Sequence, residues 1–247
     1  AIIIIIFFVP YTASGFAACG KLFHSLFGVN YVTAMVISAI VIIAYTSLGG
    51  FLAASITDFI QSIIMSVALI TVIFYGISSV GGMDAVISHV KDLPGYLSLN
   101  SSYDATSNSA SPYGIITIIS TLAWGLGYFG MPHILVRFMS IEKPSMIKKS
   151  SIVAIVWVII SLFSAVMIAY LGRMVMGAEL LTQGNQKLVF IAMARRFFPA
   201  GICGLLLAAI IAASISTADS QLLVASSSFT ADLYKPFFRK KATEKET

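Results

Sequence analysis

The sequence predicts an all-α polytopic membrane protein. Of its 247 residues, 58% are hydrophobic and 10% are charged, whereas a soluble domain carries roughly 25% charged residues. Several apolar runs reach the ~20 residues that a helix needs to cross the hydrocarbon core of a bilayer. The net charge of +5 does not indicate nucleic-acid binding, because the cationic residues lie between and after these runs. The lipid bilayer is therefore the expected environment of the chain.

Six apolar segments can be drawn as membrane spans within one transmembrane domain over residues 1–247. Their expected bounds are 1–19, 31–48, 57–78, 113–139, 150–172 and 200–229. Gly49 and Gly50 close the second segment, and residues 81–112 form a polar connection with room for a short helix. The chain begins within an apolar run and ends in a basic stretch, so we expect an internal part of a longer protein.

The distribution of lysine and arginine predicts the orientation, since cytoplasmic loops are enriched in both. Residues 139–149 and the basic segment 230–247 are expected on the cytoplasmic side. That side then holds nine cations against six on the other. The nine are Arg137, Lys143, Lys148, Lys149, Lys235, Arg239, Lys240, Lys241 and Lys245.

The segment Ser120–Met139, STLAWGLGYFGMPHILVRFM, is apolar enough to span but contains Gly125, Gly127, Gly130 and Pro132. In a helix interior glycine costs about 1 kcal/mol and proline about 3 kcal/mol. Broken backbone persists at membrane depth only where protein buries it or where it lines a cavity. Such interrupted spans mark the substrate sites of many secondary transporters. We therefore expect a broken helix at a binding site.

Aromatic side chains accompany this interruption. Trp124, Tyr128 and Pro132 follow one another at four-residue spacing, so they share a face if the helix is continuous. Aromatic rings beside freed backbone groups suit a small zwitterion or cation. The alternative is that both rings are interfacial anchors or packing residues. The neighbouring glycines and proline favour the binding interpretation.

The last apolar segment carries a stripe of small and hydroxyl-bearing residues, Ala213, Ser216, Thr217 and Ser220. Hydroxyl and carbonyl oxygens are the ligands that hard cations prefer. Alternatively, small residues allow close helix packing, and serine and threonine bond back to their own helix. Asp219 lies within the same stretch, and an acid inside an apolar span is a functional hypothesis by default.

Asp58 is the second acid close to a membrane segment. With Gln61 three residues later it fits a capping box at a helix start. A role in an ion pathway is the equally weighted alternative, and one residue can serve both.

The remaining residues of chemical interest do not form a recognisable centre. Cys19 and Cys203 lie far from any CxxC pattern, so we expect packing residues and infer no disulfide. The histidines His24, His89 and His133 are isolated, and no metal site is assigned to them. No Ser/His/Asp or Cys/His constellation is visible in the sequence, so an enzyme is not expected.

Four blocks of the sequence resemble the sodium/solute symporter family, and the sodium/proline symporters within it most closely. The blocks are YTASGFAACGKLF, GGFLAASITDFIQ, WGLGYFGMPHILVRFM and AAIIAASISTADSQLLVASSSFTADLYKPFFRKKATEKE. The resemblance implies a leucine-transporter-like fold of two inverted five-helix repeats, of which this chain resembles core helices three to eight. The first, ninth and tenth core helices would then be absent. We expect each site to be half present and the isolated chain not to transport.

The resemblance also implies roles for individual residues. Trp124, Tyr128, Pro132 and Tyr11 match positions of the family's proline site. Ala213, Ser216 and Thr217 match its sodium site. Asp58 matches an acid associated with cation coupling, and in some relatives that acid lies near hydroxyls at the positions of Asp219 and Ser220. Because Asp219 replaces one of those hydroxyls, it could face a cation, a water-filled exit path or a basic partner such as Arg137.

The function expected from this resemblance is sodium-coupled symport of L-proline by alternating access in a bacterial cell membrane. Sodium is then the co-transported ion, and a small molecule is the partner. Alternatives are the same fold carrying an osmolyte, pantothenate or another amino acid, a transporter-like sensor, or a channel. The sequence leaves open the oligomeric state, the coupling stoichiometry and the choice between sodium and protons.

Overall fold

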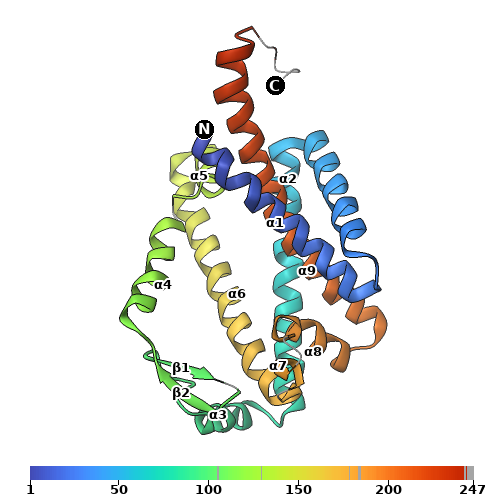
Figure 1. Ribbon diagram of the computed structural model, residues 1–247, viewed down its shortest axis with the longest axis vertical. Helices are drawn as coiled ribbons and strands as arrows, with labels where there is room; N and C mark the ends of the chain where they lie inside the picture. Colours follow the sequence, from blue (N-terminus) through green and yellow to red (C-terminus); the bar gives the residue numbers. More distant parts are fainter. Residues whose placement is uncertain (105, 129, 178, 183–184, 242, 244–247) are drawn as a thin grey trace. The chain divides into compact units, whose positions relative to one another are not determined.

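The protein is helical apart from one hairpin, as Figure 1 shows for the computed structural model. The structure describes residues 1–104, 106–128, 130–177, 179–182, 185–241 and 243. The residues of the basic segment 230–247 beyond 243, and residue 242, lie outside that description. The α-helices are α1 (Ile2–Phe27), α2 (Tyr31–Ser79), α3 (Met83–Asp92), α4 (Ile115–Tyr128), α5 (Pro132–Met139), α6 (Ile147–Met176), α7 (Glu179–Thr182), α8 (Val189–Phe197) and α9 (Ala200–Phe229).

Short elements complete the chain. Two 3-10 turns cover Pro144–Met146 and Gln186–Leu188, and a π-helical segment, Thr230–Phe238, continues α9. Strands β1 (Ser101–Asp104) and β2 (Ser109–Pro112) pair antiparallel, with Ser101 opposite Pro112. The all-α class is thus confirmed in outline, with this hairpin as the exception.

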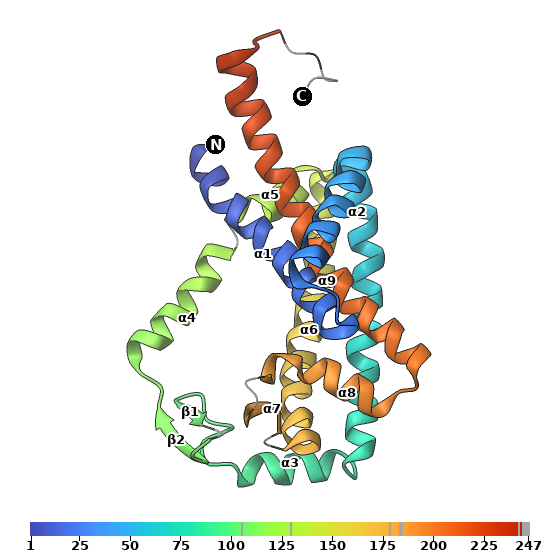
Figure 2. The ribbon, with the colours of Figure 1, turned by 45° about the vertical axis from the view of Figure 1, so that its right-hand side comes forward.

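Five helical stretches of the described residues are long and apolar enough to cross a membrane. The second of them, α2, has 49 residues, which at 1.5 Å per residue is about 74 Å, more than twice the hydrocarbon thickness. Gly50 interrupts it with φ 56° and ψ −154°, a conformation open to glycine but strained for other residues. The chain reverses there (Figure 2), so α2 consists of two antiparallel arms. If each arm and each of the other four stretches spans the bilayer, the described residues would cross it six times, the number expected from the sequence.

The described chain divides into two compact units, and the first comprises Ala1–Met65, Pro132–Arg137 and Ala208–Thr247. Within it α1 crosses α9 (Figures 1 and 2). Cys19, Ile42 and Ala218 form an apolar cluster where α1, α2 and α9 meet. A Cβ atom on Gly15 would lie only 2.8 Å from the Ala218 Cβ. The absence of a side chain at Gly15 therefore permits the close approach of α1 and α9.

The second unit comprises Ser66–Met131 and Phe138–Leu207. Its core lies between the second arm of α2, α6 and α8, where Val72, Leu171 and Met193 are completely buried. Gly76 permits this contact, because a Cβ there would lie 2.9 Å from the Leu171 Cδ1. In contrast, no described residue of α4 is buried.

The hairpin belongs to the second unit and is joined to it through aromatic rings. The Tyr96 ring lies 5.0 Å from the Tyr103 ring of β1 and 5.2 Å from the Tyr170 ring of α6, between centroids. Asp104 ends β1, and hydrogen bonds from the Thr106 N–H and the Ser107 hydroxyl lower its pKa. These contacts make the polar connection 81–112 a structured region rather than a plain loop.

Candidate functional site

The interrupted segment forms two separate helices. Helix α4 ends at Tyr128, and a turn follows in which the Gly130 N–H donates to the Gly127 carbonyl at 3.1 Å and the Met131 N–H to the Tyr128 carbonyl at 3.2 Å. Phe129 lies outside the described residues. Pro132 is the first residue of α5, a position where its missing N–H breaks no helical hydrogen bond. The sequence predicts a shared face for Trp124, Tyr128 and Pro132 only if the helix is continuous. Because α4 ends at Tyr128, Pro132 does not extend the face of Trp124 and Tyr128.

The four predicted substrate-binding residues occur as two pairs. Trp124 and Tyr128 lie on α4 in the second unit, with ring centroids 5.2 Å apart and exposed fractions of 73% and 42%. Tyr11 and Pro132 belong to the first unit. There the Phe8 ring lies 6.1 Å from the Tyr11 ring and 5.8 Å from the ring of His133, the residue after Pro132. The structure thus brings Trp124 and Tyr128 into ring contact, whereas Tyr11 is linked to the residue after Pro132 only through the Phe8 ring.

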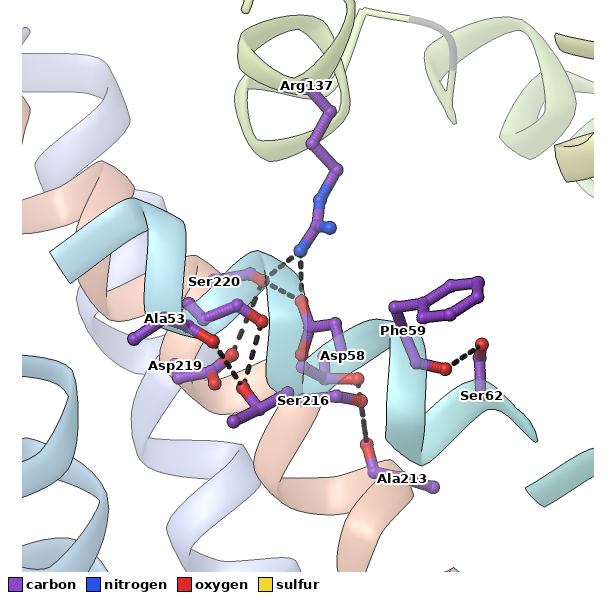
Figure 3. A network of polar contacts seen from close by, with 12 residues as sticks. Ala53, Asp58, Phe59, Ser62, Arg137, Ala213, Ser216, Asp219 and Ser220 are labelled. Carbon is purple, nitrogen blue, oxygen red and sulfur yellow. Dashed lines mark hydrogen bonds and ion pairs between the residues drawn. The ribbon is translucent and has the colours of Figure 1, made fainter. Parts of the chain in front are cut away.

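An ion pair links three elements of the first unit (Figure 3). The guanidinium of Arg137 on α5 donates to the Asp58 carboxylate on α2 and, at 2.6 Å, to the Ser220 hydroxyl on α9. The Ser220 hydroxyl in turn donates to Asp58 at 3.2 Å. The structure therefore unites Asp58 and Ser220, two of the three predicted ion-pathway residues, around a basic side chain.

The third of these residues, Asp219, has a different partner. The Tyr45 hydroxyl on α2 donates to its Oδ2 atom at 2.5 Å, and the Ser220 hydroxyl lies 3.4 Å from its Oδ1 atom. The Asp219 side chain is fully buried, with 0% exposed. Sequence reasoning missed Tyr45. The signal that could have found it is a tyrosine within an apolar run, because its hydroxyl can donate a hydrogen bond to a buried acid on another span.

The predicted sodium-binding residues lie in the middle of α9. The hydroxyls of Ser216 and Thr217 both donate to the Ala213 carbonyl at 3.1 Å. This is the back-bonding that the sequence leaves as an alternative. It occupies each hydroxyl's hydrogen but leaves oxygen lone pairs on both side chains, and these are the atoms that a sodium ion would coordinate.

Two buried acceptor atoms on the second arm of α2 have no hydrogen-bond donor in the described part of the chain. They are Asp58 Oδ1 and Gln61 Oε1, which have no hydrogen-bond partner among the described residues. Asp58 lies well inside the second arm of α2 rather than at its start, so the capping-box interpretation of Asp58 and Gln61 is wrong. A buried carboxylate oxygen without a donor is costly and calls for an explanation, and an intermittent cation is one.

A cavity of about 290 Å³ adjoins the ion pair in the first unit. It is mainly apolar, with a small number of polar side chains. The lining residues are Ile4, Phe51, Ala54, Ser55, Pro132, His133, Val136, Arg137, Ser220, Leu223, Val224, Ser227 and Ser228. An apolar pocket with a few convergent polar groups is the usual form of a small-molecule site.

The other residues considered in the sequence form no such centre. Cys19 and Cys203 are both buried free thiols. No group of three or more His, Cys, Asp or Glu side chains that could hold a metal ion occurs in the part of the chain that the structure describes.

Comparison with known proteins gives a consistent result. The family model for the sodium:solute symporter family matches residues 1–247. The osmoregulated proline transporter of Bacillus subtilis is 40% identical over 100% of this chain and 48% of its own length. Sodium/proline symporter 2 of Staphylococcus saprophyticus is 41% identical over 95% of this chain and 44% of its own length.

The high-affinity proline transporter of Bacillus subtilis is 40% identical over 99% of this chain and 50% of its own length. The chain thus spans about half the length of the curated relatives that it matches. No solved structure matches it significantly. The match over the full chain and the apolar helices that can cross a membrane lead to one conclusion: this multi-pass membrane protein belongs to the sodium:solute symporter family.

Proposed function

We propose that the whole protein couples the entry of sodium to the uptake of L-proline across a bacterial cell membrane by alternating access. The observation that carries the proposal is the arrangement on α9. There Ser216, Thr217 and the Ala213 carbonyl present oxygen atoms, and the two hydroxyls lie three residues before Asp219 and Ser220. The names of relatives at about 40% identity, which include sodium/proline symporters, support both the ion and the solute.

The substrate side of the proposal uses the interrupted segment. Trp124 and Tyr128 would contact the apolar ring of proline, while backbone groups freed between α4 and α5 would meet its charged groups. Tyr11 and Pro132 would contribute from the first unit. We further propose that the chain corresponds to core helices three to eight of an inverted-repeat fold. The reversal at Gly50 and the break before Pro132 are compatible with this assignment.

Asp58 would serve the ion pathway. Its Oδ2 atom is paired with Arg137, but its buried Oδ1 atom has no donor among the described residues. A sodium ion leaving α9 could therefore be coordinated there before it reaches the cytoplasm. If sodium raises the affinity for proline, proline must raise the affinity for sodium by the same factor.

The test is uptake of radiolabelled L-proline by proteoliposomes of the full-length protein, with and without an inward sodium gradient. Ser216→Ala/Thr217→Ala is expected to need roughly tenfold more sodium for half-maximal uptake, because a lost ligand worth about 1.4 kcal/mol changes an equilibrium tenfold. Thr71→Ala/Ser161→Ala is the matched control, since both hydroxyls also donate to the carbonyl four residues earlier.

Three outcomes are informative. A sodium-driven uptake that only the α9 variant weakens supports the ion, the solute and the site. Sodium binding without proline uptake would keep the ion site and reject proline as the solute. Uptake that is indifferent to sodium and to both α9 hydroxyls contradicts the proposed mechanism.

A further inference from the structure

We propose that the cavity of the first unit is a second, inner binding site for the transported solute, in which Arg137 binds the solute's carboxylate. The inference rests on the proposed function, because it takes a small zwitterionic amino acid as the solute. The cavity, of about 290 Å³, is close to the lower limit of ordinary small-molecule pockets. A solute of proline's size therefore fits it without a change in the packing of α2, α5 and α9.

The polar groups of the cavity suit a carboxylate. Arg137 and the hydroxyls of Ser220 and Ser228 are hydrogen-bond donors on its wall. Among the described lining residues no carboxylate is present, and the nearest one, Asp58, is already paired with Arg137. Guanidinium groups are favoured wherever planar carboxylates are recognised, because they offer parallel N–H donors.

The apolar walls suit the rest of the solute. Phe51, Leu223 and Val224 line the cavity together with Ala54, which is buried. A carbon ring would be removed from water against these side chains, which is favourable in proportion to the area covered. Serine hydroxyl oxygens remain as acceptors for the ammonium group. The cavity is therefore complementary to a compact zwitterion rather than to an inorganic ion.

The cavity's described lining residues include Pro132 but neither Trp124 nor Tyr128. Arg137 already donates to Asp58 and Ser220, so an arriving carboxylate competes with Asp58 for the guanidinium. Asp58, whose Oδ1 atom has no donor in the part of the chain that the structure describes, then loses a positive partner and gains affinity for a cation. Solute arrival in the cavity and cation binding at Asp58 therefore favour each other.

The experiment is equilibrium binding of radiolabelled L-proline to the purified full-length protein at saturating sodium. The binding stoichiometry is measured up to millimolar proline. The wild-type protein is expected to bind two molecules per chain. Val136→Trp, which places a larger side chain on the cavity wall and keeps Arg137, is expected to bind one. Val153→Trp on the exposed face of α6 is the matched control and keeps two.

A second arm tests the carboxylate. L-prolinol has the ring and amine of proline but a hydroxymethyl group in place of the carboxylate. It should fail to displace the proline molecule bound in the cavity, which is the molecule that Val136→Trp is expected to remove. Arg137→Lys keeps the charge but loses the two parallel N–H donors of the guanidinium. It should weaken the binding of the proline molecule in the cavity and leave the binding of the second proline molecule unchanged.

The outcomes separate this inference from the proposed function. A stoichiometry of one in the wild-type protein overturns the inner site but leaves the proposed function standing. A stoichiometry of two that Val136→Trp does not change overturns it as well, since the second molecule then lies elsewhere. Complete absence of proline binding in the wild-type protein instead rejects the proposed solute, and with it the inner site.

Discussion

At the scale of single residues, the buried acid Asp219 shows how a charge is accommodated inside an apolar helix. Its side chain is fully buried, yet it accepts a hydrogen bond from the Tyr45 hydroxyl, and the Ser220 hydroxyl lies 3.4 Å from its Oδ1 atom. Arg137, which the sequence offers as a basic partner for it, is instead bound to Asp58. A phenol donor satisfies the carboxylate without adding a second buried charge, so the Asp219 site depends on one hydroxyl of α2.

Tyr45→Phe is therefore expected to destabilise the protein by about 1–2 kcal/mol, since it leaves a buried carboxylate oxygen without its main donor. The measurement is the thermal unfolding midpoint of the full-length protein in detergent. Tyr75→Phe is the control, because its ring packs 4.7 Å from Phe198 and the structure describes no hydrogen bond of its hydroxyl. Equal midpoints for the two variants would show that the Tyr45 hydroxyl contributes nothing.

At the scale of helices, the first unit is organised by the contact of α1 with α9. Gly15 faces Ala218 at the point of closest approach, and the apolar clusters around Cys19 and Phe8 lie on either side of it. Small residues allow such close contacts between membrane helices, where dispersion forces replace the hydrophobic effect as the source of association. The side-chain oxygens on α9 are held in place by this packing.

Gly15→Ala is expected to lower stability by about 1–3 kcal/mol, because the added methyl group must push α9 away or distort α1. Its Cβ would lie 2.8 Å from the Ala218 Cβ. Gly204→Ala on α9 is the control, since its Cβ would meet no atom within 4 Å and alanine gains about 1 kcal/mol of helix propensity over glycine. Thermal midpoints measured for both variants should move in opposite directions. A gain in stability for Gly15→Ala would contradict the packing described.

The sequence anticipates elements better than it anticipates contacts. Long apolar runs identify membrane helices because a span needs ~20 residues without charge, a local property. The hairpin between Ser101 and Pro112 could not be found in this way, because its strands are short, serine-rich and lack the β-branched residues typical of strands. The ion pair between Asp58 and Arg137 joins residues 79 positions apart, and only tertiary packing selects Asp58 over Asp219 as the partner.

At the scale of the whole molecule, charge and helix length together constrain how the chain crosses the membrane. We expect the two arms of α2 to cross twice and the interrupted segment, α6 and α9 to add one crossing each. One crossing would then separate the hairpin from Lys149, and two would separate Lys149 from Lys240. The positive-inside rule predicts that the lysine-rich side is cytoplasmic. The hairpin is then predicted to face the cell exterior.

Cysteine labelling in intact cells tests this arrangement. Ser107→Cys should react with a membrane-impermeant maleimide from outside, whereas Lys149→Cys and Lys240→Cys should react only after permeabilisation. All three positions are exposed, and the native Cys19 and Cys203 are buried with 0% and 7% exposed, so the background is expected to be low. Labelling of Lys149→Cys and Lys240→Cys from opposite sides would require an odd number of crossings between them. One of α6 and α9 would then not span the membrane, and if that helix were α9, its side-chain oxygens could not line the proposed sodium pathway.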